Sequence, residues 1–372
     1  MSAAASEQPG QQSGQGSGQE SGQEPGQQPE PPSMVDWRLA VGLASRIAGE
    51  GPETTRDEAE AVVAELREDA ARSTGLVRDF TGLDAPDGTA PVLVVDRAGW
   101  VQANAEAFSV ATRPLMAKLA EKRPPKGLTL KLGSMVTGAE VGGLLGFLAG
   151  KVLGQFDPFH EPAGRLLLVA PNIVHVEREL EVDPHDFRLW VCLHEETHRV
   201  QFTAVPWMRG HLFSEIEAIS ESLEPTTVLE GGVERITEAL KATRNGGSII
   251  DMVSTPEQRE ILDRITGMMS LLEGHADVVM DDVGPQVIGN VEEIREKFTR
   301  RRQGIGALDK ILRRLLGLDT KMAQYRDGAR FVRAVVDKVG MEQFNAVWER
   351  AENLPSKADL SDPDGWIRRV LG

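Results

Sequence analysis

The sequence between residues 189 and 198 reads LWVCLHEETH and is the most informative stretch of the chain. His194 and His198 are four residues apart and flank Glu195 in the pattern HExxH. The chain has only 7 histidines, so this spacing is improbable by chance. Residues four apart lie on one face of an α-helix, which lets two imidazoles reach one metal ion. The pattern therefore predicts a zinc site, with Glu195 as the base that takes a proton from water.

The residues before the motif predict a helix over 184–203. Asp183 can cap this helix, Pro184 fits its first position, and Asp186 complements the positive end of the helix dipole. Apolar residues lie on nearly every side of it, so we expect a buried helix: Phe187, Leu189, Trp190, Val191, Leu193, Val200 and Phe202. Two histidines and two carboxyl groups are costly in such a helix unless they have a partner. A metal ion would be that partner, although ordinary hydrogen bonding of these side chains is the alternative.

A catalytic zinc ion normally has three protein ligands and an open position for water. The best source of the third ligand is the segment 271–277, LLEGHAD, in a helix that a capping box at 255–258 should start. Glu273 interrupts the apolar face of this helix, and we predict that it is the third metal ligand. Asp277 follows one turn later, where it can accept a hydrogen bond from a ligating histidine and fix its orientation.

Three further residues are candidates for the site. His275 is a rival ligand, but two residues after Glu273 on a helix it points elsewhere. It would then support the ligands from behind, line the substrate cleft, or serve as an ordinary polar group. Hydrolysis also needs a donor for the developing oxyanion. Tyr325, which is the only tyrosine, and His211 are candidates for that catalytic role, although either can equally be a structural hydrogen-bonding group.

Periodicity along the remaining chain predicts a mainly α protein of the α+β class with a small sheet. The strand candidates are 92–95, which ends in a turn at 96–99, and 165–170, which Pro171-Asn172 closes. The expected helices are 36–48, 56–73, 102–121, 184–203, 211–223, 229–243, 256–282, 291–303, 307–316, 320–338 and 341–350.

Composition limits the classes of protein to consider. Residues 1–33 are almost entirely Gln, Gly, Ser, Pro, Glu and Ala, so we expect a disordered tail followed by one domain over 34–372. The net charge of the 372 residues is −16, which disfavours a nucleic-acid partner. Cys192 is the single cysteine and no signal peptide is visible, so we expect a cytoplasmic location.

Glycine recurs every four residues at Gly138, Gly142, Gly146, Gly150 and Gly154. On a helix these residues form a smooth stripe, which in a membrane would favour helix pairing. The apolar run from 140 to 151 is too short to span a bilayer. We therefore predict a buried helix whose glycines let a neighbouring backbone come close, and we expect no membrane contact.

The motif residues 189–198, the preceding Pro171-Asn172-Ile173 and the later 273–277 together resemble the actinobacterial zincin-like hydrolases, a zinc-dependent metalloprotease family. Some members of that family are associated with biosynthesis of the deazaflavin coenzyme. The similarity runs from Val35 to Ile367 and thus excludes the polar tail. It implies a zincin-like fold and a metal site, but no substrate. The pattern Glu273-x-x-x-Asp277 is similar to the gluzincin arrangement, which supports a carboxylate as third ligand.

These observations support three hypotheses. The first is a zinc-dependent hydrolase, most simply a metallopeptidase, that acts on a peptide or another amide and uses Glu195 to activate water. The second is a zinc-binding protein of zincin-like fold that has no activity and serves partner recognition. The third is a helical scaffold that binds no metal. Replacing His194 and His198 would then cause no loss of zinc, because none would be bound.

Overall fold

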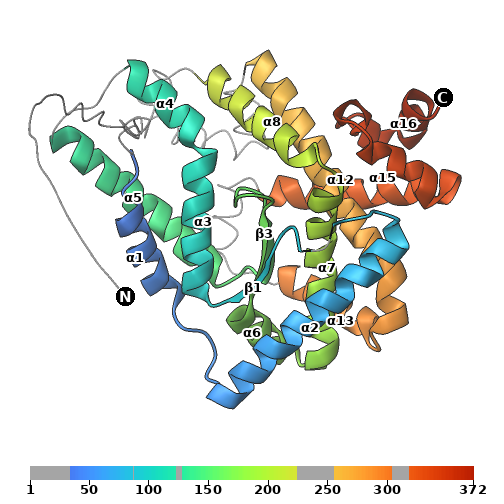
Figure 1. Ribbon diagram of the computed structural model, residues 1–372, viewed down its shortest axis with the longest axis horizontal. Helices are drawn as coiled ribbons and strands as arrows, with labels where there is room; N and C mark the ends of the chain where they lie inside the picture. Colours follow the sequence, from blue (N-terminus) through green and yellow to red (C-terminus); the bar gives the residue numbers. More distant parts are fainter. Residues whose placement is uncertain (1–33, 87, 123–127, 224–254, 304–317) are drawn as a thin grey trace, which may run out of the picture. The chain divides into compact units, whose positions relative to one another are not determined.

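The computed structural model describes residues 34–86, 88–122, 128–223, 255–303 and 318–372, without the side chains of 120–122, 128–131, 302–303 and 318–326. The expected tail 1–33 and the expected helices 229–243 and 307–316 lie outside the described residues. Helices dominate the rest, and three short strands form one sheet (Figure 1). The prediction of a mainly helical protein with a small sheet is confirmed. The described residues between 34 and 372 form one compact unit.

The helices of the described residues fall into three stretches of the chain. The first stretch contains α1 (Trp37–Ala48), α2 (Arg56–Thr81), α3 (Arg97–Ala111), α4 (Arg113–Lys122) and α5 (Leu128–Ala149). The second contains α6 (Ala170–Leu180), α7 (Pro184–Ala204) and α8 (Met208–Ser222). The third contains α12 (Pro256–Val287), α13 (Val291–Gln303), α15 (Leu318–Phe344), three short 3-10 turns between Asn345 and Ser361, and α16 (Pro363–Val370).

The sheet has the strand order β1-β3-β2, with β1 (Val92–Val95), β2 (Gly154–Asp157) and β3 (Arg165–Val169). The central strand β3 is parallel to β1, with Val92 opposite Leu166, and antiparallel to β2, with Gly154 opposite Leu168. All five residues of β3 are buried, as expected for a strand with helices on both faces. Strands β1 and β3 match the two predicted strands. Strand β2 was not predicted, because GQFD has no alternating apolar pattern.

Alternate residues of β3 contribute to two different hydrophobic clusters. Leu167 and Val169 pack with the buried Trp100 of α3 and Leu145 of α5, a group that also includes Ala44 of α1. Leu168 packs instead with residues of α2, α6 and α7: Leu66, Ile173 and Val191. Successive side chains of a strand point to opposite faces, so α1, α3 and α5 cover one face and α2, α6 and α7 the other (Figure 1).

The structure differs from three local predictions, two around α3 and one at the start of α6. The expected turn at 96–99 is the first turn of α3, because the Asp96 side chain accepts a hydrogen bond from the Gly99 amide at 2.7 Å. The single helix expected over 102–121 is divided at Thr112 into α3 and α4. Pro171, expected to close a strand, lies in the first turn of α6, where its missing N–H costs nothing.

The C-terminal third follows the predicted helices closely. The break expected between 338 and 341 is a kink inside α15 at Gly340, whose φ of 82° lies in the left-handed region. The expected helix 341–350 is shorter, because α15 ends at Phe344 and the chain continues as a 3-10 turn over Asn345–Trp348. Helix α16, which Asp362 caps by accepting from the Gly365 amide, was not predicted.

Helix α5 packs Gly138, Gly142 and Gly146 against α1, as the sequence predicts, but the helix ends at Ala149. Gly150 and Gly154 therefore lie outside the stripe, and Gly154 belongs to β2. A Cβ atom at Gly138 would lie 2.6 Å from the backbone oxygen of Asp36, and one at Gly142 would lie 2.7 Å from that of Ala40. The prediction that α5 is buried is wrong for its N-terminal half, where Leu132, Met135 and Val136 are exposed. The segment Leu132–Ala149 is long and apolar enough to cross a membrane, with 28% of it buried.

Candidate metal centre

Helix α7 carries the HExxH motif and begins where the sequence predicts. The Asp183 side chain accepts hydrogen bonds from the amides of His185 and Asp186, both at 3.0 Å, and Pro184 occupies the first turn. The helix packs against α2, α12 and the sheet. Leu193 and Val200 are fully buried in a core that includes Leu272 of α12. The motif is thus held inside the protein on a helix that is enclosed on several sides.

Glu196 illustrates how the buried polar groups of α7 are paired. Its carboxyl group is fully buried and accepts from Arg199 Nε at 2.7 Å and from Thr74 Oγ1 of α2 at 3.1 Å. Arg199 also donates to Thr74 Oγ1 at 2.8 Å and to the carbonyl oxygen of Ala90 at 3.3 Å. Burial raises the pKa of Glu196, against the lowering effect of Arg199. This network attaches α7 to α2 and leaves the metal-facing side of α7 to other residues.

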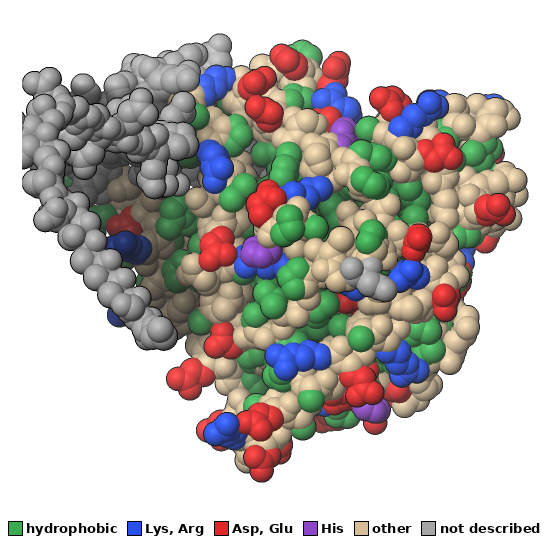
Figure 2. Space-filling view, in the orientation of Figure 1, with side chains coloured by type: hydrophobic (Ala, Val, Ile, Leu, Met, Phe, Trp, Pro, Cys, Tyr) green, Lys and Arg blue, Asp and Glu red, His purple; other side chains and the backbone are tan. Residues whose placement is uncertain are grey.

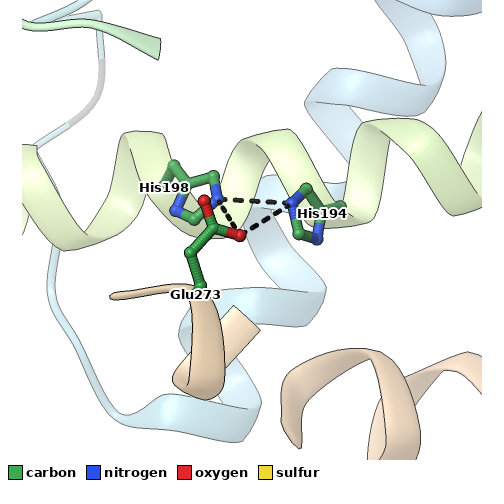
Figure 3. Close-up of side chains that lie close together, drawn as sticks. All are labelled: His194, His198 and Glu273. Carbon is green, nitrogen blue, oxygen red and sulfur yellow. Dashed lines mark hydrogen bonds and ion pairs between the residues drawn. The ribbon is translucent and has the colours of Figure 1, made fainter. Parts of the chain in front are cut away.

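The two histidines and Glu273 converge on one point (Figure 3). The Nε2 atoms of His194 and His198 are 3.3 Å apart, and each lies 3.8 Å from Oε2 of Glu273 on α12. One ligand atom from each residue lies within 4.8 Å of the other two. Part of each side chain reaches solvent, with exposed fractions of 27%, 14% and 24% respectively. The structure therefore brings together the three residues predicted from the sequence as metal ligands.

The donor set and its spacing fit a zinc ion. Two imidazole nitrogens and one carboxylate oxygen are a common zinc ligand set that leaves a fourth position for water. A tetrahedron with metal–ligand bonds of about 2.05 Å has edges of about 3.3 Å. The observed separations of 3.3 and 3.8 Å are close to that edge length, so an ion can enter with small side-chain movements.

Glu195 lies on the same helix between the two histidines, with only 8% of the residue exposed. Burial, and then the charges of Glu273 and Glu196, raise the pKa of Glu195 to about 8. A cation held by the three ligands would counteract this effect, because it favours the ionised form of a nearby carboxyl group. A raised pKa in a partly open cluster is typical of a catalytic acid or base.

These observations coincide with a family match over most of the chain. A family model described as zincin-like metallopeptidase matches residues 35–367. The chain belongs to this family. A solved structure from Chloroflexus aurantiacus, described as a candidate hydrolase with a novel fold, is 33% identical, with a TM-score of 0.67. The similarity covers 90% of this chain and 98% of that one. No curated protein matches the chain.

Other site candidates of this zincin-like protein lie in different surroundings. Asp277 is one turn after Glu273 on α12, and its backbone oxygen accepts from Arg295 Nη2 at 3.4 Å. His211 lies on α8, with Nε2 3.9 Å from Oε1 of Glu215, and it is not part of the three-residue cluster. Tyr325 falls within α15, but its side chain lies outside the described residues. The roles suggested for these residues stay predictions.

His275 is fully buried, so it does not line an open cleft. Its ring stacks on Phe344 with a centroid distance of 5.8 Å and meets Trp348 edge-on at 5.3 Å. Its Nδ1 atom lies 2.9 Å from Nε2 of Gln201. Burial lowers the pKa of His275 to about 3, which keeps the ring neutral. This buried position excludes the cleft-lining role. The other two suggestions, a residue that supports the ligands from behind and an ordinary polar group, stay predictions.

Two residues beside the cluster were not predicted from the sequence. Gln201 accepts a hydrogen bond from Nδ1 of His198 at 3.0 Å. Its position three residues after His198, on the same helix face, was a usable signal. Gly154 of β2 touches Glu195, and a Cβ atom there would lie 2.5 Å from Cγ of Glu195. No pattern in the sequence indicates that contact, because the two residues are 41 positions apart and meet only after folding.

Proposed function

We propose that this zincin-like protein is a zinc-dependent hydrolase of peptide or other amide bonds. His194, His198 and Glu273 would hold the ion, and Glu195 would act as general base. The observation that carries the proposal is the convergence of three suitable ligand atoms within 4.8 Å, on the open side of a buried HExxH helix. The family to which the chain belongs supports it.

When bound at such a site, zinc lowers the pKa of a water ligand and polarises the substrate carbonyl group. The residues of the chain would perform the proton transfers and hold the ion. Glu195, buried against β2, takes the proton from the attacking water and can later deliver it to the leaving nitrogen. His194 and His198 would present Nε2 to the ion, and Glu273 would add a negative charge that offsets part of the ionic charge. His211 and Tyr325 are proposed donors to the oxyanion, and Asp277 is proposed to orient a ligating histidine.

Zinc stoichiometry is the first test, with wild-type protein, Glu273→Ala and Glu260→Ala purified without chelators and reconstituted with zinc. Glu260 is an exposed glutamate on the same helix, outside the cluster, so it controls for loss of a helix carboxylate. We expect about one zinc per chain in the wild type and in Glu260→Ala, and much weaker retention in Glu273→Ala. A wild type that binds no zinc after reconstitution contradicts the proposal and favours the metal-free scaffold.

Turnover separates an enzyme from a zinc-binding interaction protein. We expect a library of fluorogenic peptides and simple amides to contain a substrate whose hydrolysis stops on addition of a chelator. Zinc binding without any hydrolysis, together with a specific protein partner that co-purifies, supports the non-catalytic alternative instead.

Location and partners are proposed from composition and from the surface of the molecule. A cytoplasmic location is consistent with the single, buried Cys192. The absence of a nucleic-acid partner is proposed from the net charge of −16 and from the face drawn in Figure 2, where Lys and Arg side chains alternate with Asp and Glu. No membrane partner is proposed, because α5 uses its glycine face to pack on α1. A relation to actinobacterial members linked with deazaflavin coenzyme biosynthesis stays a proposal from resemblance.

A further inference from the structure

Gln201 lies fully buried on α7, one turn after His198, and its side-chain amide is close to three different groups. We infer that Gln201 is a positioning residue: it holds His198 in the tautomer that binds a metal ion and connects that ligand to the turn of α12 that carries Glu273. The effect on metal binding rests on the proposed function. The hydrogen-bond geometry on which the inference is based does not depend on a metal ion.

The backbone determines which way the amide group of Gln201 points. One end of the amide lies 2.9 Å from the carbonyl oxygen of Leu272 on α12. A carbonyl oxygen can only accept a hydrogen bond, so the Gln201 atom that faces it must be the NH2 nitrogen. The other end of the amide, which faces His198 Nδ1 at 3.0 Å, is therefore the oxygen.

The orientation of the amide determines the protonation of His198. An amide oxygen cannot donate, so Nδ1 of His198 must carry the hydrogen of this contact. In a neutral imidazole the other nitrogen then has a free lone pair. That nitrogen is Nε2, which lies 3.3 Å from Nε2 of His194 and 3.8 Å from Oε2 of Glu273. Gln201 thus directs the lone pair of His198 into the ligand cluster.

His275 completes the arrangement on the far side of the amide. The NH2 group of Gln201 has a second hydrogen, and Nδ1 of His275 lies 2.9 Å away and can accept it. The His275 ring is wedged against Phe344 and Trp348, so it gives the amide a rigid partner. Rotating the amide by half a turn would leave buried polar groups without partners, which costs about 1–3 kcal/mol for each group.

The same amide also connects two elements that are far apart in the sequence. Leu272 directly precedes Glu273, so the bond from Gln201 holds the α12 turn that carries Glu273 at a set distance from α7. One side chain therefore controls both the protonation of one ligand and the position of another. Loss of such a supporting hydrogen bond typically lowers metal affinity by about 10-fold to 100-fold.

The test compares Gln201→Met with Gln258→Met. Methionine is close to glutamine in length but cannot form these hydrogen bonds. Gln258 is a second glutamine with low exposure, on α12, and its side chain accepts from the Thr255 amide at 3.0 Å and donates to the Ser222 carbonyl at 2.9 Å. Replacing Gln258 removes two hydrogen bonds at the start of α12 and leaves the ligand cluster unchanged. Zinc affinity is measured by competition with a chelator, and histidine tautomers are read from long-range proton–nitrogen NMR spectra of metal-free protein.

In metal-free wild type and in Gln258→Met, we expect His198 to carry its proton on Nδ1. In Gln201→Met, we expect the preference of His198 for that tautomer to be lost. Zinc affinity should fall about 10-fold to 100-fold in Gln201→Met only. Gln201→Glu is a second, independent variant. It keeps an oxygen that accepts from His198, so His198 should keep its proton on Nδ1. An unchanged tautomer and unchanged affinity in Gln201→Met overturn the inference.

The two proposals fail in different ways. If wild-type protein binds no zinc, the proposed function fails, yet the tautomer comparison between wild type and Gln201→Met still decides the role of Gln201. If zinc binds equally well to all variants while the tautomer does not change, the metal site stands and the positioning role is wrong.

Discussion

Glu195 is the residue on which the proposed chemistry depends most. Its carboxyl group is buried between the sheet and the ligand cluster, and the same burial that raises its pKa makes it a strong base once it is ionised. Its neighbour Glu196 has the same chemistry but a different role, because Arg199 and Thr74 engage its carboxyl group. Two adjacent carboxylates on one helix are therefore distinguished by their partners alone.

Replacing Glu195 by glutamine tests the assignment of the base. We expect Glu195→Gln to retain about one zinc per chain and to lose hydrolysis by about 100-fold to 10,000-fold, because the amide fills the same space but cannot take a proton. Zinc content and initial rates on the same preparation are the measurements. Substantial activity in this variant means that another group activates the water.

At the scale of elements, strand β2 and helix α7 meet at a contact that only glycine permits. A side chain at Gly154 would occupy the space of the Glu195 carboxyl group, with Cβ 2.6 Å from Cδ. Strand β2 therefore limits the space available to the Glu195 side chain on that side. Its position in turn depends on β3, with which it pairs from Gly154 to Asp157.

We predict that Gly154→Ala loses activity while keeping its zinc, because the added methyl group displaces Glu195 but not the ligands. Rates and zinc content are compared with Gly143→Ala, whose Cβ would meet nothing within 4 Å. The control should match wild type in both measurements. Equal loss of zinc and activity in Gly154→Ala would show instead that the substitution disturbs the whole cluster.

Helices α12 and α15 cross where each has a glycine. A Cβ atom at Gly274 would lie 2.2 Å from the backbone carbon of Gly328, and one at Gly328 would lie 1.9 Å from the backbone oxygen of Ser270. Neither contact can be relieved by a side-chain rotation, because the obstructing atoms belong to the backbone. The crossing supports the part of α12 that carries Glu273.

Gly328→Ala is therefore expected to destabilise the protein by several kcal/mol, a cost typical of severe overpacking. Urea unfolding followed by circular dichroism measures the change. Gly75→Ala, on α2 with nothing within 4 Å of its added Cβ, should have an effect of less than about 1 kcal/mol. Similar unfolding midpoints for the two variants would mean that the two helices separate easily.

At the scale of the molecule, the proposed metal site joins α7 to α12 beside a hydrophobic cluster to which both helices contribute. An ion bound by both helices should stabilise the folded state, because the unfolded chain does not bring the three ligands together. The stabilisation is about 4 kcal/mol when free zinc is 1,000 times its dissociation constant.

We expect a chelator to lower the melting temperature of wild-type protein by several degrees and to leave that of Glu273→Ala almost unchanged. Thermal unfolding with excess zinc and with excess chelator is the measurement. A melting temperature of the wild type that does not respond to zinc is incompatible with an ion shared by the two helices.

Stability should also depend on pH through Asp69 of α2, which is only 7% exposed and whose Oδ2 has no hydrogen-bond partner among the described residues. Burial, and then the charge of Glu65, raise its pKa from 3.8 to about 6. The folded state therefore holds this proton more tightly than the unfolded state. The contribution of Asp69 to stability is thus greatest below pH 4 and is lost as the pH rises through 6.

Asp69→Asn should remove that dependence. We expect the variant to be more stable than wild type by about 1–2 kcal/mol at pH 7.5 and to have no advantage at pH 4, as measured by urea unfolding at both values. Asp79→Asn, an exposed carboxylate on the same helix, is the control and should be neutral. An equal effect of Asp69→Asn at both pH values would assign it to packing and not to charge.

Much of this architecture could be predicted from neighbouring residues alone. The caps Asp183 and Thr255 and the period of the apolar residues predicted where α7 and α12 begin, because helix formation depends on contacts three and four residues apart. The same local geometry predicted that His194 and His198 share a face, and an isolated carboxylate on an apolar face singled out Glu273.

Tertiary structure decided what surrounds those residues. The contact of Gly154 with Glu195, the fully buried position of His275 and the amide bridge of Gln201 all join segments that lie tens of residues apart. Such contacts leave no periodic pattern, because they depend on how helices cross and on which small residues allow close approach. Local sequence thus determined the helices and the ligand types, whereas packing determined which polar partners orient the ligands and the base.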